Sequence, residues 1–216
     1  MTAEEGTSPI KFDCQDLLTA VELFHVHDTG ASRYRQMIED GVPYNLDLVV
    51  PVLTSWKAHR GTGDAAMLRN VLSEFVTERH DDLDHLRGTQ LSSLSDQDLE
   101  SERSLVAFLD GRGFRPTAWG KSLHMLVPNA ILLWDREVVR GRYDLSDDVE
   151  GFLSYQRFGR RLAISLGTEL LNVPKQHATA AGYIESIPKI LDELAYSWDG
   201  SARAVLSLGG HSAAFA

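Results

Sequence analysis

The sequence predicts an all-α protein, and three observations support this fold class. Apolar residues recur at the helical period of 3.6 over most of the chain, strand-like alternation never lasts more than a few residues, and residues that cap or end helices separate the periodic segments. The 216 residues suffice for a single helical domain over 1–216, or for two small helical lobes around one cleft.

The individual helices follow from periodicity and from the residues that interrupt it. Helices are expected at 13–27, 46–59, 65–76, 99–109, 118–127, 149–171 and 184–198, with another beginning at Asp135. Asp64 and the run Ser95-Asp96-Gln97-Asp98 are typical helix starts. Pro51 is expected in the first turn of its helix, and Asn172-Val173-Pro174 is expected to break the helix that begins at 149. The tail 200–216, rich in Gly, Ser and Ala, is expected to be loosely ordered.

Charge and cysteine content exclude several classes of protein. Cys14 is the only cysteine, which excludes internal disulfides, a four-cysteine iron–sulfur cluster and a multi-cysteine zinc site, and no cofactor is predicted. The net charge of −10 opposes extensive contact with nucleic acid, whose binding depends on neutralising phosphates. The charge is uneven, however, because residues 112–161 carry nine cations and six acids. A local basic face is therefore compatible with the sequence.

Nothing in the sequence indicates a membrane protein. No apolar run approaches the roughly 18 residues that a membrane span requires. The first residues lack the positive and then apolar regions of a secretory signal. We therefore expect a cytoplasmic protein with no membrane partner.

The segment from Leu109 onward is the most informative part of the chain. It reads Leu-Asp-Gly-Arg-Gly-Phe-Arg-Pro-Thr-Ala, and after Pro128 comes Trp-Asp-Arg-Glu-Val-Val-Arg over 134–140. This pattern predicts a helix, a Gly-x-Gly hairpin and a second helix over 105–127, and then an aspartate that opens another helix. Glycines at such a turn allow positive φ angles, and the backbone N–H groups that begin the next helix suit a phosphate oxygen.

This order resembles the signature of the helix-hairpin-helix DNA glycosylases, Leu-Pro-Gly-x-Gly-x-x-Thr-Ala followed by Asp-x-x-Val-x-Arg. The match covers about thirty residues, with Asp135 placed 24 residues after Gly111. The resemblance implies a compact multi-helix fold and a DNA repair hydrolase that cleaves the N-glycosidic bond of a nucleobase. Its partner would be DNA or a nucleotide, and it would need no cofactor.

The resemblance also assigns roles to residues. Asp135 would be catalytic, stabilising the positively charged sugar as the base leaves. Gly111 and Gly113 would bind phosphate. The other candidate substrate-binding residues lie around the motif: Arg115, Lys121, His124, Trp134 and Arg140. Bifunctional family members carry a nucleophilic lysine where this chain has Arg115, and Lys121 is about a turn and a half too late, so a monofunctional hydrolase is expected.

The residues taken alone leave other interpretations open. Taken alone, Trp134 and His124 fit the core better than a binding role, and Asp135 is also compatible with a simple helix N-cap. A non-enzymatic helical protein that binds protein or nucleic acid is the main alternative, and it predicts Asp135 sealed as a cap. A metal-dependent phosphohydrolase comes third, and it requires His27, Asp28 and His80 to converge. The glycosidase hypothesis requires Asp135 at the rim of a concave pocket, with Gly111 and Gly113 at the same mouth.

Overall fold

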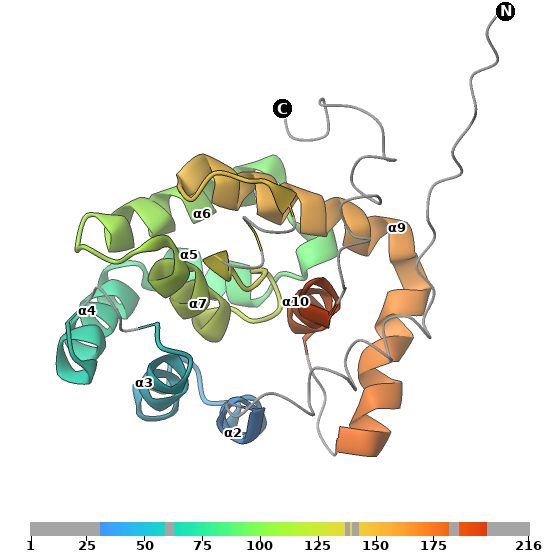
Figure 1. The fold of residues 1–216 in the computed structure, drawn as a ribbon, viewed down its shortest axis with the longest axis horizontal. Coiled ribbons are helices and arrows are strands. Elements are labelled where there is room, and N and C mark those ends of the chain that lie inside the picture. Colours follow the sequence, from blue (N-terminus) through green and yellow to red (C-terminus); the bar gives the residue numbers. More distant parts are fainter. Residues whose placement is uncertain (1–30, 59–62, 137–138, 140–142, 182–185, 198–216) are drawn as a thin grey trace, which may run out of the picture.

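The computed structural model describes residues 31–58, 63–136, 139, 143–181 and 186–197, and every regular element in these ranges is a helix (Figure 1). In chain order they are α2 (Ala31–Asp40), α3 (Leu46–Ser55), α4 (Ala65–Glu78), α5 (His80–Arg87), the short η1 (Leu91–Ser93), α6 (Asp96–Asp110), α7 (Pro116–Leu126), α9 (Val149–Ala181) and α10 (Ile187–Ser197). The all-α prediction is confirmed for these residues. The helix expected at 13–27 and the tail 200–216 lie outside them.

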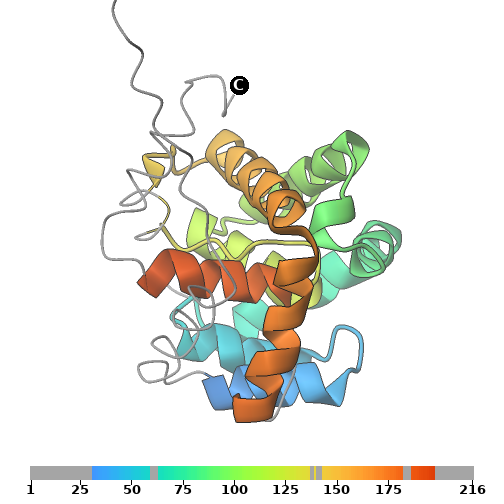
Figure 2. The same ribbon diagram turned by 90° about the vertical axis from the view of Figure 1, so that its right-hand side faces the viewer.

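Helix α7 is the central helix of the protein. Every residue from Ala118 to Leu126 is buried, including the polar ones. The layer formed by α2, α3 and α4 covers one side of α7, and α6 and α9 cover the other (Figures 1 and 2). Polar side chains on such a helix need partners inside the protein, because water cannot reach them.

Two predicted helix starts are confirmed with their capping contacts. The Asp64 carboxylate accepts a hydrogen bond from the Met67 N–H at 2.8 Å and begins α4. Ser95 and Asp98 form a reciprocal capping box at the start of α6, with the Ser95 N–H donating to the Asp98 carboxylate at 2.6 Å and the Asp98 N–H donating to the Ser95 hydroxyl at 3.2 Å.

Two expectations about prolines were wrong. Pro51 lies in the middle of α3 rather than in its first turn. The carbonyl that would have received the missing N–H bond belongs to Asp47, which is exposed, so water can satisfy it. Helix α9 continues through 172–174 to Ala181, and its irregularity falls at Gly167 instead, where φ is 53°. Glycine adopts this left-handed conformation without the steric cost that other residues meet.

The hairpin expected over 105–127 is formed by α6, a tight turn and α7. Helix α6 ends at Asp110, and Gly113 takes a φ of 83° that reverses the chain. The Phe114 N–H donates back to the Leu109 carbonyl at 3.1 Å, and the Phe114 ring is buried. Pro116 then begins α7, a position that suits proline because the first helical N–H has no partner within the helix.

Glu102 on α6 is fully buried, and neither of its carboxyl oxygens has a hydrogen-bond partner among the described residues. Burial raises its pKa well above the ordinary value of 4.5, the charge of Asp98 raises it further, and Arg157 opposes the rise. We expect Glu102→Met to increase the free energy of unfolding by about 1–3 kcal/mol, since an unsatisfied buried group is removed. Urea denaturation measures this change.

The gain from Glu102→Met should depend on pH in a defined direction. Because the pKa of Glu102 is higher in the folded than in the unfolded chain, deprotonation above pH 4.5 favours unfolding of the parent protein. The advantage of the variant should therefore be larger at pH 8 than at pH 4.5. Glu100→Met, an exposed position on the same helix, serves as the control. An advantage that is independent of pH would contradict a buried ionisable group as the cause.

Candidate functional site

The segment that carries Asp135 is held in place by a buried glutamine on α9. The Gln156 side-chain amide donates to the Leu132 carbonyl at 3.1 Å, and its oxygen accepts from the Leu132 N–H at 2.8 Å. Leu132 lies in the extended stretch between α7 and Asp135, where the backbone has no helical partners. One fully buried side chain thus satisfies both backbone groups of this residue and fixes the path of the chain towards Asp135.

Gly120 allows this segment to lie against α7. A Cβ atom built on Gly120 would stand 2.4 Å from the Trp134 Cβ, a distance too short for two carbon atoms. The Trp134 ring packs among Trp119, Phe152 and Tyr155 and is fully buried. A glycine at 120 therefore brings Asp135, the residue after Trp134, beside Lys121, the residue after Gly120.

Lys121 and Asp135 form an ion pair at this contact. The Lys121 Nζ lies 2.9 Å from the Asp135 Oδ2, and the side chains retain exposed fractions of 10% and 23%. Asp135 also occupies the position before the helical residue Arg136, and its carbonyl accepts from the Val139 N–H at 2.8 Å. A carboxylate that is partly open to solvent and paired with a lysine can face a bound molecule.

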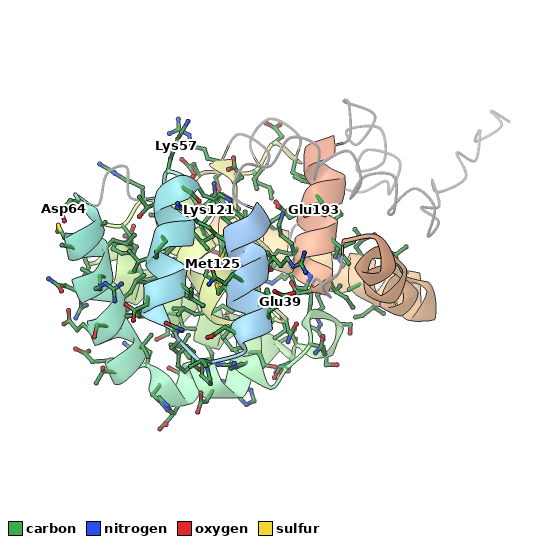
Figure 3. The ribbon with its side chains drawn as sticks, turned by 90° about the horizontal axis from the view of Figure 1, so that it is seen from below. Glu39, Lys57, Asp64, Lys121, Met125 and Glu193 are labelled. Atoms are coloured by element: carbon green, nitrogen blue, oxygen red, sulfur yellow. The ribbon has the colours of Figure 1, made fainter. Side chains whose placement is uncertain are left out.

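The Trp56 side chain at the end of α3 lies beside Lys121, and Tyr34 of α2 packs against Trp56. The Lys121 Nζ lies 5.8 Å from the centre of the Trp56 ring and 3.4 Å from the Trp56 carbonyl. Tyr34 on α2 stacks against both Trp56 and His124. The Lys121 side chain is only 10% exposed, and with little water around the ammonium group its attraction to Asp135 is stronger. Figure 3 shows Lys121 between α3 and α2.

Helix α10 adds three buried charged residues that the sequence did not predict for the site. The Lys189 Nζ lies 2.9 Å from a Glu193 carboxyl oxygen and 3.4 Å from Asp192, and all three side chains are buried. Burial raises the pKa of Asp192 to about 6; Lys189 opposes the rise, Asp135 adds to it and Lys121 opposes it. Their spacing of three and four residues is typical of salt bridges on an exposed helix face, so the sequence pattern gave no sign of burial.

The hairpin glycines are exposed, but their N–H groups are used within the turn. The Gly111 N–H donates to the Ala107 carbonyl at 3.0 Å, and the Gly113 N–H donates to the Asp110 carbonyl at 2.9 Å. Arg112 pairs with Glu74 at 2.6 Å and lies over the Phe108 ring. A phosphate at the hairpin would therefore contact other groups, namely the exposed Arg115 and the N-terminal backbone of α7.

The other predicted binding residues differ in accessibility. His124 is fully buried, and its ring nitrogens lie 2.7 Å from the Ile131 carbonyl and 3.1 Å from the Tyr34 hydroxyl. Because a carbonyl oxygen can only accept, the Nδ1–H donates to Ile131, and in the neutral ring Nε2 accepts from the Tyr34 hydroxyl. Trp134 is buried as well, so contact between either side chain and a substrate would require the surrounding core to open. Arg140 lies outside the described residues.

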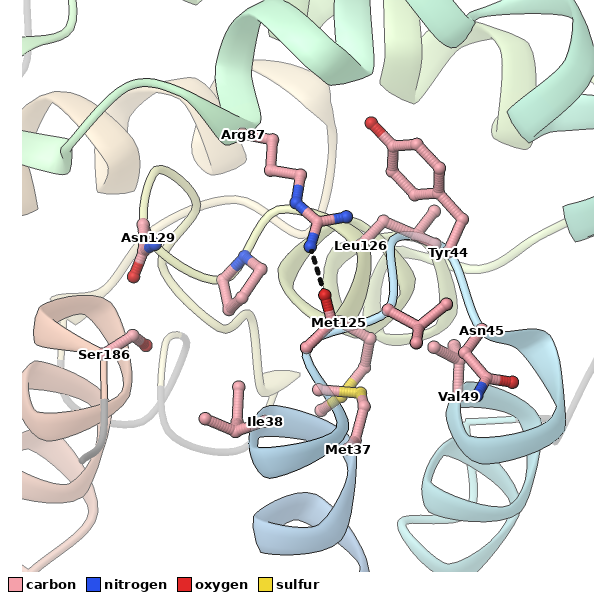
Figure 4. Close-up of a pocket in the computed structure, with 13 residues that line it drawn as sticks. Met37, Ile38, Tyr44, Asn45, Val49, Arg87, Met125, Leu126, Asn129 and Ser186 are labelled. Atoms are coloured by element: carbon pink, nitrogen blue, oxygen red, sulfur yellow. Dashed lines mark hydrogen bonds between the residues drawn. The ribbon is translucent and has the colours of Figure 1, made fainter. Parts of the chain in front are cut away.

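A cavity of about 240 Å³ lies at the other end of α7 from the hairpin (Figure 4). Its walls come from α2, α3, the C-terminal ends of α5 and α7, and Ser186. Its lining mixes apolar side chains, such as Met37, Val49 and Met125, with about as much polar surface, and Arg87 donates to the Gly41 carbonyl at its edge. None of the predicted site residues lines this cavity, so it is not the pocket that the glycosidase hypothesis requires around Asp135.

The described residues contain no group of three or more His, Cys, Asp or Glu side chains that could hold a metal ion. His80 is exposed and lies 3.6 Å from Asp84, whereas His85 pairs with Asp98 on α6 at 2.6 Å. His27 and Asp28, which the phosphohydrolase hypothesis also needs, lie outside the described residues. None of the described helices combines the length and apolar character needed to cross a membrane.

Gly120→Ala tests how the site is built. Glycine to alanine in a helix normally stabilises a protein, but here the new methyl group would meet Trp134. We expect the free energy of unfolding to fall by about 1–3 kcal/mol through overpacking. Gly88→Ala is the matched control, because its Cβ would make only ordinary contacts of 3.6 Å or more at a right-handed helix end. Thermal and urea unfolding of both variants measure the effect, and equal stability of the two would contradict this account.

Comparison of the chain with protein-family models, with curated proteins and with solved structures finds no match.

Proposed function

We propose that this protein is a hydrolase of N-glycosidic bonds that removes a nucleobase from DNA or from a nucleotide. The main support for the proposal is the ion pair between Lys121 and Asp135, whose charged atoms lie 2.9 Å apart. Lys121 lies on α7, the second helix of the helical hairpin, and Asp135 lies in the segment that follows α7. The pair combines a carboxylate partly open to solvent with a cation that is nearly buried. The sequence resemblance around Gly111 and Asp135 supports the same activity.

In the proposed reaction Asp135 faces the sugar. As the bond between C1′ and the base nitrogen breaks, positive charge develops on the sugar, and a nearby carboxylate stabilises it. Asp135 can also accept a proton from the water that attacks C1′. In a polynucleotide the target nucleotide would have to leave the base stack to reach this carboxylate.

Lys121 is assigned a positioning role in this reaction. The sequence spacing predicts that Lys121 comes too late in the chain to be the nucleophilic lysine of bifunctional family members, and its side chain contacts Asp135. An ammonium group in an ion pair has no free electron pair and is not a nucleophile. Lys121 therefore orients Asp135, and water remains the nucleophile of a monofunctional hydrolase.

The hairpin would hold the phosphate of the same nucleotide. The Arg115 side chain is exposed and makes no ion pair with a described residue. The Thr117 N–H lies in the first turn of α7, where backbone N–H groups have no partner within the helix and the helix dipole favours an anion. This contact needs few cations, which suits a chain with a net charge of −10.

The experiment is a search for released free base by mass spectrometry. The purified protein is incubated with nucleotides and with oligonucleotides that carry damaged or modified bases, and Asp135→Asn is run alongside. Release that requires Asp135 supports the proposal. No release from the whole panel, by a protein that is folded, would argue for the interaction protein instead.

Borohydride and Lys121→Arg test the role of the lysine. If Lys121 only positions Asp135, no covalent adduct with DNA is trapped on reduction, and Lys121→Arg keeps part of the activity because it keeps the charge. If Lys121 attacks the sugar, an adduct forms and Lys121→Arg abolishes it, because a guanidinium cannot form a Schiff base.

A further inference from the structure

A second carboxylate belongs to the surroundings of the Lys121–Asp135 pair. Asp192 on α10 has an exposed fraction of only 3%, and its Oδ1 has no hydrogen-bond partner among the described residues. The other oxygen lies 3.4 Å from the Lys189 Nζ. A buried carboxylate with only one satisfied oxygen is unfavourable for folding, so its presence needs another explanation.

The geometry around Trp56 links Asp192, through its partner Lys189, to the Lys121–Asp135 pair, and the pKa shifts of two buried groups agree with this. The charges of Asp135 and Lys121 both act on the pKa of Asp192. The pKa of the buried Tyr155 is raised by burial first, and also by Tyr143, Asp192 and Asp135. Finally, Lys121 and Lys189 each place their Nζ 5.8 Å from the centre of the Trp56 ring.

Among the described residues, the charged side chains of this site include more acids than bases. Two ammonium groups face three carboxyl groups: Lys121, Lys189, Asp135, Asp192 and Glu193. If all are ionised, these five side chains carry a charge of −1, and if Asp192 holds a proton they are neutral. Figure 3 shows two of them, Lys121 on α7 and Glu193 on α10, at the two sides of α2.

We propose that Asp192 is a positioning residue of this site, whose gain or loss of a proton sets the charge around Asp135. This inference rests on the proposed function, because the reaction that the charge would affect is the proposed release of a base. When Asp192 releases its proton to water, the site gains a negative charge. That charge stabilises the positive sugar of the transition state, so base release should become faster as pH rises through about 6.

The groups that face Asp192 come from several elements. Lys189 and Glu193 lie on its own helix, Lys121 comes from α7, Asp135 precedes Arg136, and Tyr155 comes from α9. Of these groups, Asp135 lies outside α10 and its charge raises the pKa of Asp192. Removing that charge should therefore lower the pKa of Asp192, and this change can be measured without any substrate.

The first test is a titration of the aspartate carboxyl carbons by NMR. The Asp192 signal is identified by its loss in Asp192→Asn, and we expect its midpoint near pH 6 in the parent protein. In Asp135→Asn the midpoint should fall by about 0.5–1 pH unit, the effect of one nearby charge. Asp144→Asn, at an exposed aspartate, should leave it unchanged. An identical midpoint in Asp135→Asn and the parent would overturn the proposal.

The second test measures the rate of base release between pH 5 and 8. The parent rate should rise through about pH 6, whereas Asp192→Asn should show no such rise and should be slower above it. A rise that persists unchanged in Asp192→Asn overturns the proposal. Absence of release from every variant would overturn the proposed function instead, and the NMR titration still decides whether Asp192 and Asp135 are coupled.

Discussion

Asp135→Asn should slow base release by about 10²–10⁴-fold, the contribution typical of one positioned acid–base group. Asparagine has the same shape, can still accept a hydrogen bond from Lys121 and is as good a helix N-cap as aspartate. The change therefore removes the negative charge and the ability to take a proton from water, with little effect on the path of the chain. Single-turnover rates, measured with saturating protein, report the chemical step.

Two comparisons make the Asp135→Asn result specific. Asp144→Asn is the same chemical change at an exposed residue with positive φ, where asparagine is well tolerated, and it should keep the parent rate. Circular dichroism should show that both variants are folded. A parent-like rate in Asp135→Asn would remove Asp135 from the reaction, whatever the stability of the variant.

Lys189→Met should have the largest effect on stability. Lys189 is 1% exposed and pairs with Glu193 at 2.9 Å and Asp192 at 3.4 Å. Methionine fills a similar volume but leaves two buried carboxyl groups without this cation. Breaking a buried ion pair from one side typically costs about 3–5 kcal/mol, and we expect a loss of this size in urea unfolding at pH 7.5.

The loss in Lys189→Met should shrink as pH falls. Without Lys189 the pKa of Asp192 rises above its value of about 6, while in the unfolded chain it stays near 3.8. Deprotonation between these values favours the unfolded state, so the variant loses stability with rising pH and regains it in acid. Adding Asp192→Asn to Lys189→Met should restore part of the stability at pH 7.5.

An exposed lysine provides the control for this experiment. Lys57→Met should change the free energy of unfolding by no more than about 0.5 kcal/mol, because Lys57 is exposed. If Lys189→Met were equally mild, the charges on α10 would contribute little to the fold. The burial of these three charged side chains would then need an explanation other than stability.

The sequence predicted the helices wherever local signals are strong. Asp64 and the Ser95–Asp98 pair cap their helices through hydrogen bonds that span three residues. The glycines after Asp110 reverse the chain within one turn. The positions of Pro51 and Gly167 were not predicted correctly. Whether a helix tolerates a proline or changes direction at a glycine depends on which carbonyls reach water and which faces are buried, and these are tertiary properties.

The sequence by itself determined the helical hairpin, the place of Asp135 before a helix and the presence of Lys121 nearby in the chain. Only the tertiary structure decided that Lys121 contacts Asp135, that His124 and Trp134 belong to the core, and that Lys189, Asp192 and Glu193 are buried. It also brings Lys189 and Lys121 to the same Trp56 ring. Helical periodicity extends over a few residues, whereas Lys121 contacts a residue fourteen positions later and shares the Trp56 ring with Lys189, almost seventy positions away. In the sequence, charged residues three and four positions apart indicate a helix face exposed to solvent. Whether another part of the chain buries that face depends on the tertiary structure.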